Sequence, residues 1–201
     1  STLPKVMCIV IGVSAGGMDA LSMIIPSIPA DFTVPVVVVQ HISPSSDNYM
    51  TRYLDSISQL KVKEIDEKEK LEAGHVYTAP PNYHVLIEED QTFSLSVDDR
   101  VNFARPSIDV LFDSASDVFG KRLIGIVLTG ANNDGSQGLK HIKEGGGIAI
   151  VQDPATAEVD GMPRAALAAT KPDFVVKLDE IPYLLRELVE YKSSPNNDER
   201  R

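Results

Sequence analysis

Short runs of aliphatic residues recur along the chain, and most of them end in a turn of small or polar residues. The clearest runs are residues 6–11, 35–39, 123–128 and 148–151. Uninterrupted apolar runs of this length are typical of strands that are buried on both faces, as in a parallel sheet. Between the runs, apolar residues return at helical spacing. This alternation predicts an α/β fold with a doubly wound, mostly parallel sheet and helices on both faces, a Rossmann-like three-layer sandwich.

The middle of the chain departs from this rhythm. Four short strand-like runs follow one another between residues 62 and 97, with turn residues between them and no long helical segment. Phe93, Leu95 and Val97 alternate with polar residues, as in a hairpin strand with one exposed face. We therefore expect a small antiparallel hairpin region within the α/β fold.

The length of 201 residues suits one domain. We see no internal repeat and no linker that would divide the chain, so we expect a single domain over residues 1–191. Residues 192–201 are polar and include Pro195, which predicts a flexible tail.

Charge and cysteine content argue against several classes of function. Nineteen Lys and Arg against 29 Asp and Glu leave a net charge of −10, whereas nucleic-acid binders usually carry a basic face. The single cysteine, Cys8, excludes a disulfide framework and a cysteine-rich zinc site. No histidine and carboxylate pair has a metal spacing such as H-E-x-x-H, so we expect neither metal nor cofactor.

The sequence also lacks the signals of membrane insertion and export. No apolar run reaches the ~18 residues that a membrane span needs. The first ten residues do not have the charged and apolar regions of a signal peptide. We expect a cytoplasmic protein that does not insert into membranes and that is a monomer.

Chemically active side chains follow three of the predicted strands. Ser14 lies in the glycine-rich turn after the first run, His41 follows the second, and Asp134 lies in the turn after residues 123–128. In an open parallel sheet, sites form beyond the carboxyl ends of the strands. A hydroxyl, an imidazole and a carboxylate are therefore expected at one edge of the sheet, as in a nucleophile, its base and the group that orients the base.

The chemistry explains why these residue types belong together. A serine hydroxyl is a weak nucleophile and needs a base within hydrogen-bond reach, at about 3 Å. A histidine can take the proton and return it to the leaving group, and an aspartate fixes its tautomer. Ser14 also lies at the start of a predicted helix, where free N–H groups favour a developing oxyanion.

Each residue also has a plainer interpretation. A serine in a glycine-rich turn is more often a phosphate-loop residue or a helix cap, His41 alone would be structural, and Asp134 fits ordinary turn chemistry. The dinucleotide-binding pattern requires G-x-G-x-x-G and an acidic residue after the second strand, but here the glycines are 12, 16 and 17 and the strand ends in Gln40-His41. No lysine follows Gly17, which excludes a Walker loop. The three residues together favour catalysis.

At these positions the chain resembles the catalytic domain of the CheB-type protein-glutamate methylesterases of bacterial chemotaxis. The family's I-G-x-S-x-G-G turn matches residues 11–17, its Q-H pair matches Gln40-His41, and its L-T-G-x-x-x-D-G matches residues 128–135. Further similar segments are residues 77–81, 105–112 and 161–164. The resemblance extends from about Val6 to Leu188.

The resemblance implies that Ser14, His41 and Asp134 form a catalytic triad. It also implies that the substrate and oxyanion region includes Ala15, Gly16, Ala131 and Asn132. Members of the family hydrolyse glutamate methyl esters on chemoreceptors, and some deamidate receptor glutamines, through an acyl-enzyme on the serine and without a cofactor. The implied partner is a methylated chemoreceptor or a similar protein.

This chain departs from the family pattern at several positions. Ala131-Asn132 replaces the Met-Gly that chemotaxis members commonly have, Ala15 stands where Thr is frequent, and Asp160 replaces an apolar residue. The family's usual N-terminal receiver domain is absent from these 201 residues, so we expect no response to a phosphodonor. A built-in lid formed by residues 74–97 over Ser14 is the alternative that we consider.

Two functions of different class remain open. The first is a serine esterase acting on a methylated receptor, and the second is a noncatalytic or regulatory relative that serves as a partner-binding module. The three catalytic residue types favour the esterase, since a binding module does not need all of them. A nucleotide-binding α/β domain is disfavoured by the glycine spacing.

Overall fold

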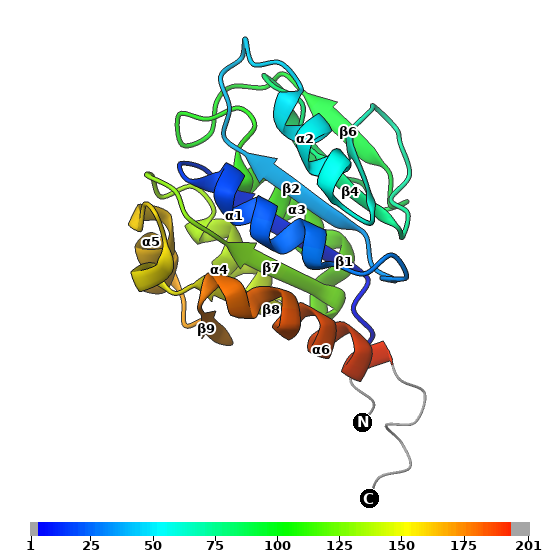
Figure 1. The fold of residues 1–201 in the computed structure, drawn as a ribbon. Helices are drawn as coiled ribbons and strands as arrows, with labels where there is room; N and C mark the ends of the chain where they lie inside the picture. The colour runs from blue at the N-terminus through cyan, green and yellow to red at the C-terminus, as the bar shows by residue number, and fades with distance from the viewer. Residues whose placement is uncertain (1–3, 194–201) are drawn as a thin grey trace, which may run out of the picture.

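A seven-stranded parallel sheet lies between two layers of helices in the computed structural model, which describes residues 4–193 (Figure 1). The strands of this sheet are β1 (Cys8–Val13), β2 (Val36–Gln40), β3 (Lys61–Glu64), β4 (His75–Thr78), β7 (Leu123–Val127), β8 (Ile148–Gln152) and β9 (Phe174–Val176). A separate antiparallel pair consists of β5 (His84–Ile87) and β6 (Phe93–Ser96). The helices are α1 (Gly17–Ile24), α2 (Tyr49–Ile57), α3 (Ile108–Phe119), α4 (Ser136–Glu144), α5 (Gly161–Ala169) and α6 (Ile181–Ser193).

Strand β1 lies at the centre of the sheet, between β2 and β7, in the order β3-β4-β2-β1-β7-β8-β9. The chain builds outward from β1 in one direction through β2 and in the other through β7. The point where the winding reverses is therefore at β1. A crevice forms at the carboxyl ends of the strands at such a point, and this is where α/β proteins place their ligands.

Alternate residues of β1 face opposite layers, because side chains in a strand alternate between its two faces. Ile9, Ile11 and Val13 belong to the core beneath α1, α2 and α6, whereas Cys8 and Val10 belong to the core beneath α3, α4 and α5. Figure 1 shows α1 and α6 in front of the sheet and α3 and α4 behind it. The central strand is buried on both sides, as the uninterrupted apolar run predicts.

Gly12 lets α3 approach β1 closely near the carboxyl end of the strand. A Cβ atom at this position would lie 2.4 Å from Cγ2 of Ile108, the first residue of α3. Real Cβ atoms do not come that close, so only glycine fits here without a shift of the helix. The contact places the N-terminus of α3 directly behind the turn that follows β1.

The structure confirms the predicted fold class and adds two details. Strands β3 and β4 join the parallel sheet, and only β5 and β6 form the antiparallel hairpin. The crossover from β3 to β4 is made of turns, so the sequence there carries no helical spacing to mark it. The tail predicted from residue 192 falls largely outside the described residues, and α6 includes residues 192 and 193.

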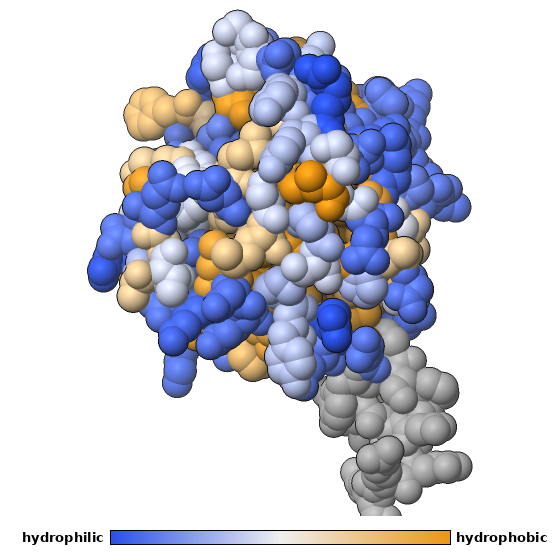
Figure 2. Space-filling view, viewed as in Figure 1, coloured by the Kyte–Doolittle hydropathy of each residue, from blue (hydrophilic) through white to orange (hydrophobic). Residues whose placement is uncertain are grey.

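The face of the molecule that Figure 2 shows carries mostly polar side chains. In Figure 2, apolar side chains form small groups that are separated by polar and charged ones. Within residues 4–193, no helix has the length and apolar character to cross a membrane.

We expect the buried side chains of α3 to contribute strongly to the free energy of unfolding. Phe112 on α3 is fully buried, so Phe112→Ala should lower the free energy of unfolding by about 3–5 kcal/mol. The matched control is Phe103→Ala, since the Phe103 side chain is 97% exposed and its loss should matter by no more than about 0.5 kcal/mol. Urea denaturation of both variants measures the difference, and equal losses would contradict this packing.

Candidate active site

A pocket of about 330 Å³ opens at the carboxyl edge of the sheet. Its lining residues are Ser14, His41, Ile42, Arg100, Asn102, Phe103, Ala104, Arg105, Pro106 and Asn132. The structure thus brings the predicted Ser14, His41 and Asn132 to one space. Asp134 is fully buried and bonds to the His41 ring.

Ser14 lies in the tight turn between β1 and α1. Its N–H donates to the carbonyl of Thr129 after β7 (2.9 Å), and its own carbonyl accepts from the N–H of Gly17 (2.9 Å). Gly16 has a φ of 82°, a left-handed conformation that a glycine adopts without strain. The turn is therefore fixed at the backbone to the neighbouring strand end, while the Ser14 side chain borders the pocket.

Gln40 joins the turn that carries Ser14 to the segment that carries His41. Its side-chain Nε2 donates to the carbonyl of Ser14 (2.9 Å) and to the carbonyl of His41 (3.0 Å). The N–H of His41 also donates to the carbonyl of Val13 (3.1 Å), which continues the parallel pairing of β1 with β2. Gly17 makes room for this arrangement, because a Cβ there would lie 1.9 Å from Gln40 Oε1.

The His41 ring is bonded through both of its nitrogens. Nε2 lies 2.6 Å from Oδ2 of Asp134, and Nδ1 lies 3.0 Å from Nδ2 of Asn132. The Asn132 side chain is itself held by the backbone, since its Oδ1 accepts from the N–H of Asp134 (3.0 Å). The hydroxyl of Ser14 makes no hydrogen bond to another residue in the described part of the chain.

The carboxylate of Asp134 occupies the N-terminus of α3. Besides His41, its partners are Ile108 N (2.7 Å), Asn102 Nδ2 (2.8 Å), Ser107 Oγ (2.9 Å), Asp109 N (3.1 Å) and Gly135 N (3.1 Å). A helix N-terminus favours an anion, because its first N–H groups have no acceptor within the helix. Burial tends to raise the pKa of Asp134, but the hydrogen bonds from His41 and Ile108 outweigh it, so that the pKa is lowered.

A second carboxylate caps the neighbouring helix in the same way. Oδ1 of Asp109, in the first turn of α3, accepts from the N–H groups of Gly138 (2.7 Å) and Gly135 (3.0 Å) at the start of α4. Burial raises the pKa of Asp109, and the nearby charge of Asp134 adds to the increase. Asn102 bridges the two carboxylates, since its Nδ2 also donates to Asp109 (2.7 Å). Each helix is thus capped by an acidic side chain that belongs to the other helix or its leading turn.

Several residues of this network are not identified by the sequence. Gln40, Ser107 and Asp109 lie in recognised motifs, but their hydrogen bonds cannot be read from the spacing, and Asn102 carries no distinctive pattern. Ser107 is the N-cap residue of α3, but its hydroxyl donates to Asp134 rather than capping the helix. The Asp134 carboxylate takes over the capping, because one anion satisfies two backbone N–H groups.

The rim of the pocket is formed by a tight turn at residues 101–104. Val101 and Ala104 exchange two backbone hydrogen bonds (3.0 Å each), and Asn102 and Phe103 between them have positive φ values of 52° and 62°. This conformation is unusual for a bulky residue such as Phe103. The hairpin region of residues 74–97 contributes no lining residue to the pocket, so a lid made of that region is not what borders Ser14.

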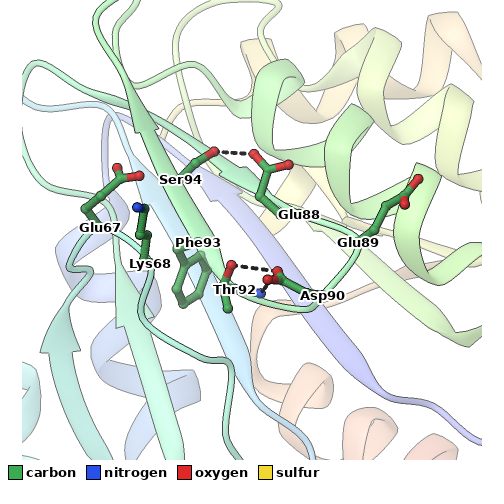
Figure 3. A pocket seen from close by; sticks show the side chains of 8 residues that line it. All are labelled: Glu67, Lys68, Glu88, Glu89, Asp90, Thr92, Phe93 and Ser94. Atoms are coloured by element: carbon green, nitrogen blue, oxygen red, sulfur yellow. Dashed lines mark hydrogen bonds between the residues drawn. The ribbon is translucent and has the colours of Figure 1, made fainter.

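Another hollow lies beside the β5–β6 hairpin and has a different chemistry. Figure 3 shows it surrounded by acidic side chains, where Glu88 accepts from Ser94 (2.5 Å) and Asp90 accepts from Thr92 (2.6 Å). No histidine lines it. In the described part of the chain, no three His, Cys, Asp or Glu side chains gather in a group that could hold a metal ion.

Unpaired backbone donors are available around Ser14. Among residues 4–193, none accepts a hydrogen bond from the backbone N–H groups of Ala15, Gly16, Ala131 or Asn132. Two of these groups lie at the start of α1 and two lie in the turn after β7. They are the kind of donors that stabilise an oxyanion during acyl transfer.

An open parallel sheet with a serine, a histidine and a buried aspartate at its carboxyl edge is an arrangement that serine hydrolases use. Comparison with known proteins identifies the family. Residues 9–185 match the family model of the CheB methylesterases. The chain belongs to this family.

Individual relatives agree with this assignment. A Leptospira interrogans protein is 56% identical over 180 residues, which cover 90% of this chain and 93% of that protein, and its name provisionally gives the activities protein-glutamate methylesterase and protein-glutamine glutaminase. A Thermotoga maritima protein with the same two activities in its name is 38% identical over 184 residues, 90% of this chain and 54% of the relative. The crystal structure of the Thermotoga maritima CheB methylesterase catalytic domain matches with a TM-score of 0.87 and 35% identity, over 93% of this chain and 99% of that one.

The two buried carboxylates should affect acid stability in opposite directions. The lowered pKa of Asp134 means that the folded state binds the proton less tightly than the unfolded state. The Asp134 carboxylate therefore adds to the free energy of unfolding above the ordinary aspartate pKa of about 3.9, and this stabilisation is lost as the pH falls further. The raised pKa of Asp109 has the opposite effect, since the folded state binds this proton more tightly. The stabilisation that it adds to the free energy of unfolding is lost as the pH rises above about 3.9.

Urea denaturation between pH 2.5 and pH 6 tests this difference. Asp134→Asn should make the acid loss of unfolding free energy shallower than in the wild type, and Asp109→Asn should make it steeper. An Asp134→Asn variant with the wild-type acid slope would contradict the role given to this carboxylate.

Proposed function

We propose that this protein is a serine esterase that hydrolyses glutamate methyl esters on chemoreceptors, with Ser14, His41 and Asp134 as its catalytic residues. The observation that carries the proposal is the 2.6 Å contact of His41 Nε2 with the buried Asp134, on a ring that shares a pocket with Ser14. Membership of the CheB methylesterase family gives the reaction class. The second activity in the relatives' names, deamidation of a protein glutamine, suits the same residues with ammonia in place of methanol.

The reaction has two steps. Ser14 Oγ attacks the ester carbonyl carbon while His41 Nδ1 takes the hydroxyl proton, and methanol leaves with that proton as the acyl-enzyme forms. Water then attacks the acyl-enzyme, again passing a proton to His41, and the glutamate carboxyl and Ser14 are released. Asp134 stabilises the imidazolium that exists between the proton transfers.

The negative charge that develops on the carbonyl oxygen during each attack must be stabilised by hydrogen-bond donors. We assign this role to the unpaired N–H groups of Ala15 and Gly16 in the turn that carries Ser14, and of Ala131 and Asn132 in the turn after β7. The N-terminal end of α1 adds its partial positive charge. Losing one oxyanion donor in such enzymes costs about 10²–10³-fold in kcat.

The rim suits a protein substrate. Phe103 is almost completely exposed beside the pocket, and Arg100 lines the same rim. Exposed aromatic and arginine side chains are enriched where proteins contact one another. We propose that the substrate is a methylated chemoreceptor or a similar protein that docks on this rim.

We also propose that the protein acts as a monomer in the cytoplasm. On the face that Figure 2 shows, apolar side chains are interspersed with polar ones, whereas interfaces between subunits usually present larger apolar patches. The only cysteine, Cys8, is buried and free, which is compatible with a reducing compartment.

Ser14→Ala should reduce methanol release from a methylated receptor by at least about 10³-fold, because it deletes the nucleophile. The matched control is Ser22→Ala on α1, where the hydroxyl bonds only to the carbonyl of Met18 (2.6 Å) and activity should be unchanged. The fold should persist in both variants. Demethylation by Ser14→Ala at a rate near the wild type would refute the assignment.

The three residues should act as a unit. A double variant, Ser14→Ala with Asp134→Asn, should be scarcely slower than Ser14→Ala alone. Additive losses would mean that the residues act independently. A fluorophosphonate probe should label Ser14 in the wild type, whereas a noncatalytic partner-binding module would remain unlabelled.

A further inference from the structure

Asn132 bonds to the ring nitrogen of His41 that the proposed mechanism needs as a base. Asn132 Nδ2 lies 3.0 Å from His41 Nδ1, while the other ring nitrogen is occupied by Asp134. Asn132 also lines the pocket that holds Ser14 and is only partly buried. A polar side chain of the pocket lining therefore occupies the ring nitrogen that would act as the base.

The hydrogen-bond network fixes the orientation of the Asn132 amide. Its Oδ1 accepts from the backbone N–H of Asp134 (3.0 Å), so the amide nitrogen is the atom that faces the ring. An amide NH₂ group can only donate. His41 Nδ1 must therefore be the acceptor, and the ring proton lies on Nε2, from which it is donated to Asp134. The bond from Asn132 and the bond to Asp134 select the same neutral tautomer.

We propose that Asn132 is a positioning residue that restrains His41, because its amide competes with Ser14 for the lone pair of Nδ1. This inference rests on the proposed function. In the described structure the Ser14 hydroxyl has no acceptor, and the Nδ1 lone pair is already used. Asn132 must release Nδ1 before Ser14 can transfer its proton, so it lowers the reactivity of Ser14 until a substrate displaces the amide.

The other charged groups around the ring do not take over this role. Asp134 lies at Nε2, with Asp109 next to it through Asn102. Arg100 and Arg105 line the same pocket, and Arg105 donates to Asn82 Oδ1 (2.8 Å) and to the backbone carbonyls of residues 97 and 98. Asn132 is the neighbour that donates to Nδ1.

Two substitutions separate the bond to His41 from the role of Asn132 in the turn. Asn132→Ser keeps a short side-chain acceptor for the N–H of Asp134 but removes the amide donor to the ring. Asn132→Asp keeps an acceptor of the same length and replaces the donor by a carboxylate, which favours the protonated ring. A purely structural role in the turn predicts that both variants behave like the wild type.

The test measures how fast a small fluorophosphonate labels Ser14 between pH 5.5 and pH 9. Asn132→Ser should raise the plateau rate about 2–10-fold, the worth of one ordinary hydrogen bond. The acid limb of its pH profile should move to higher pH, because the neutral ring loses a donor that stabilises it. Asn132→Asp should be slower than the wild type at pH 7, with its acid limb moved further in the same direction.

Asn133→Ser is the matched control, since this exposed neighbour receives the same substitution without contact with the ring. If the wild type is not labelled at Ser14, as judged against Ser14→Ala, the proposed function fails. If the wild type is labelled but both Asn132 variants match Asn133→Ser, the present inference alone is overturned. A slower plateau for Asn132→Ser also overturns it, because Asn132 would then assist the reaction. Asn132→Asp tests the inference even if Asn132→Ser does not fold.

Discussion

The buried carboxylate of Asp134 holds the site together. A charge in the interior costs several kcal/mol unless hydrogen bonds compensate for it. Here the compensation comes from the first N–H groups of α3, from side chains that precede α3, and from the His41 ring. One anion therefore joins the turn after β7 to α3 and sets the direction of the ring that borders Ser14.

The carboxylate that caps α3 is therefore the same group that orients the His41 ring. Asp109 in turn caps α4, the helix that begins shortly after Asp134 in the sequence. Asn102 lies between the two carboxylates and belongs to the rim turn that also carries Phe103. The rim, the two helices and the histidine are thus connected through a few polar atoms, and a shift in one of them changes the hydrogen bonds of the others.

The sequence predicts the parts of this structure that depend on local pattern. The buried runs mark the central strands, and the parallel sheet then brings Ser14, His41 and Asp134 to one edge. The parallel pairing of β3 and β4 is not predicted, because their connection contains no helix. The bonds of Asn102 and Gln40 are also missed, since they depend on register and on a loop conformation that only the folded chain defines.

Gln40 fixes the backbone separation of the nucleophile and the base. Its single amide group bonds to the backbone carbonyls of both Ser14 and His41, and Gly17 leaves space for it. The spacing is thereby set by main-chain atoms of adjacent strands, which substitutions at the rim do not touch. A substitution in the turn of residues 101–104 can therefore change the hydrogen bonds around the His41 ring while the backbone separation of Ser14 and His41 stays the same.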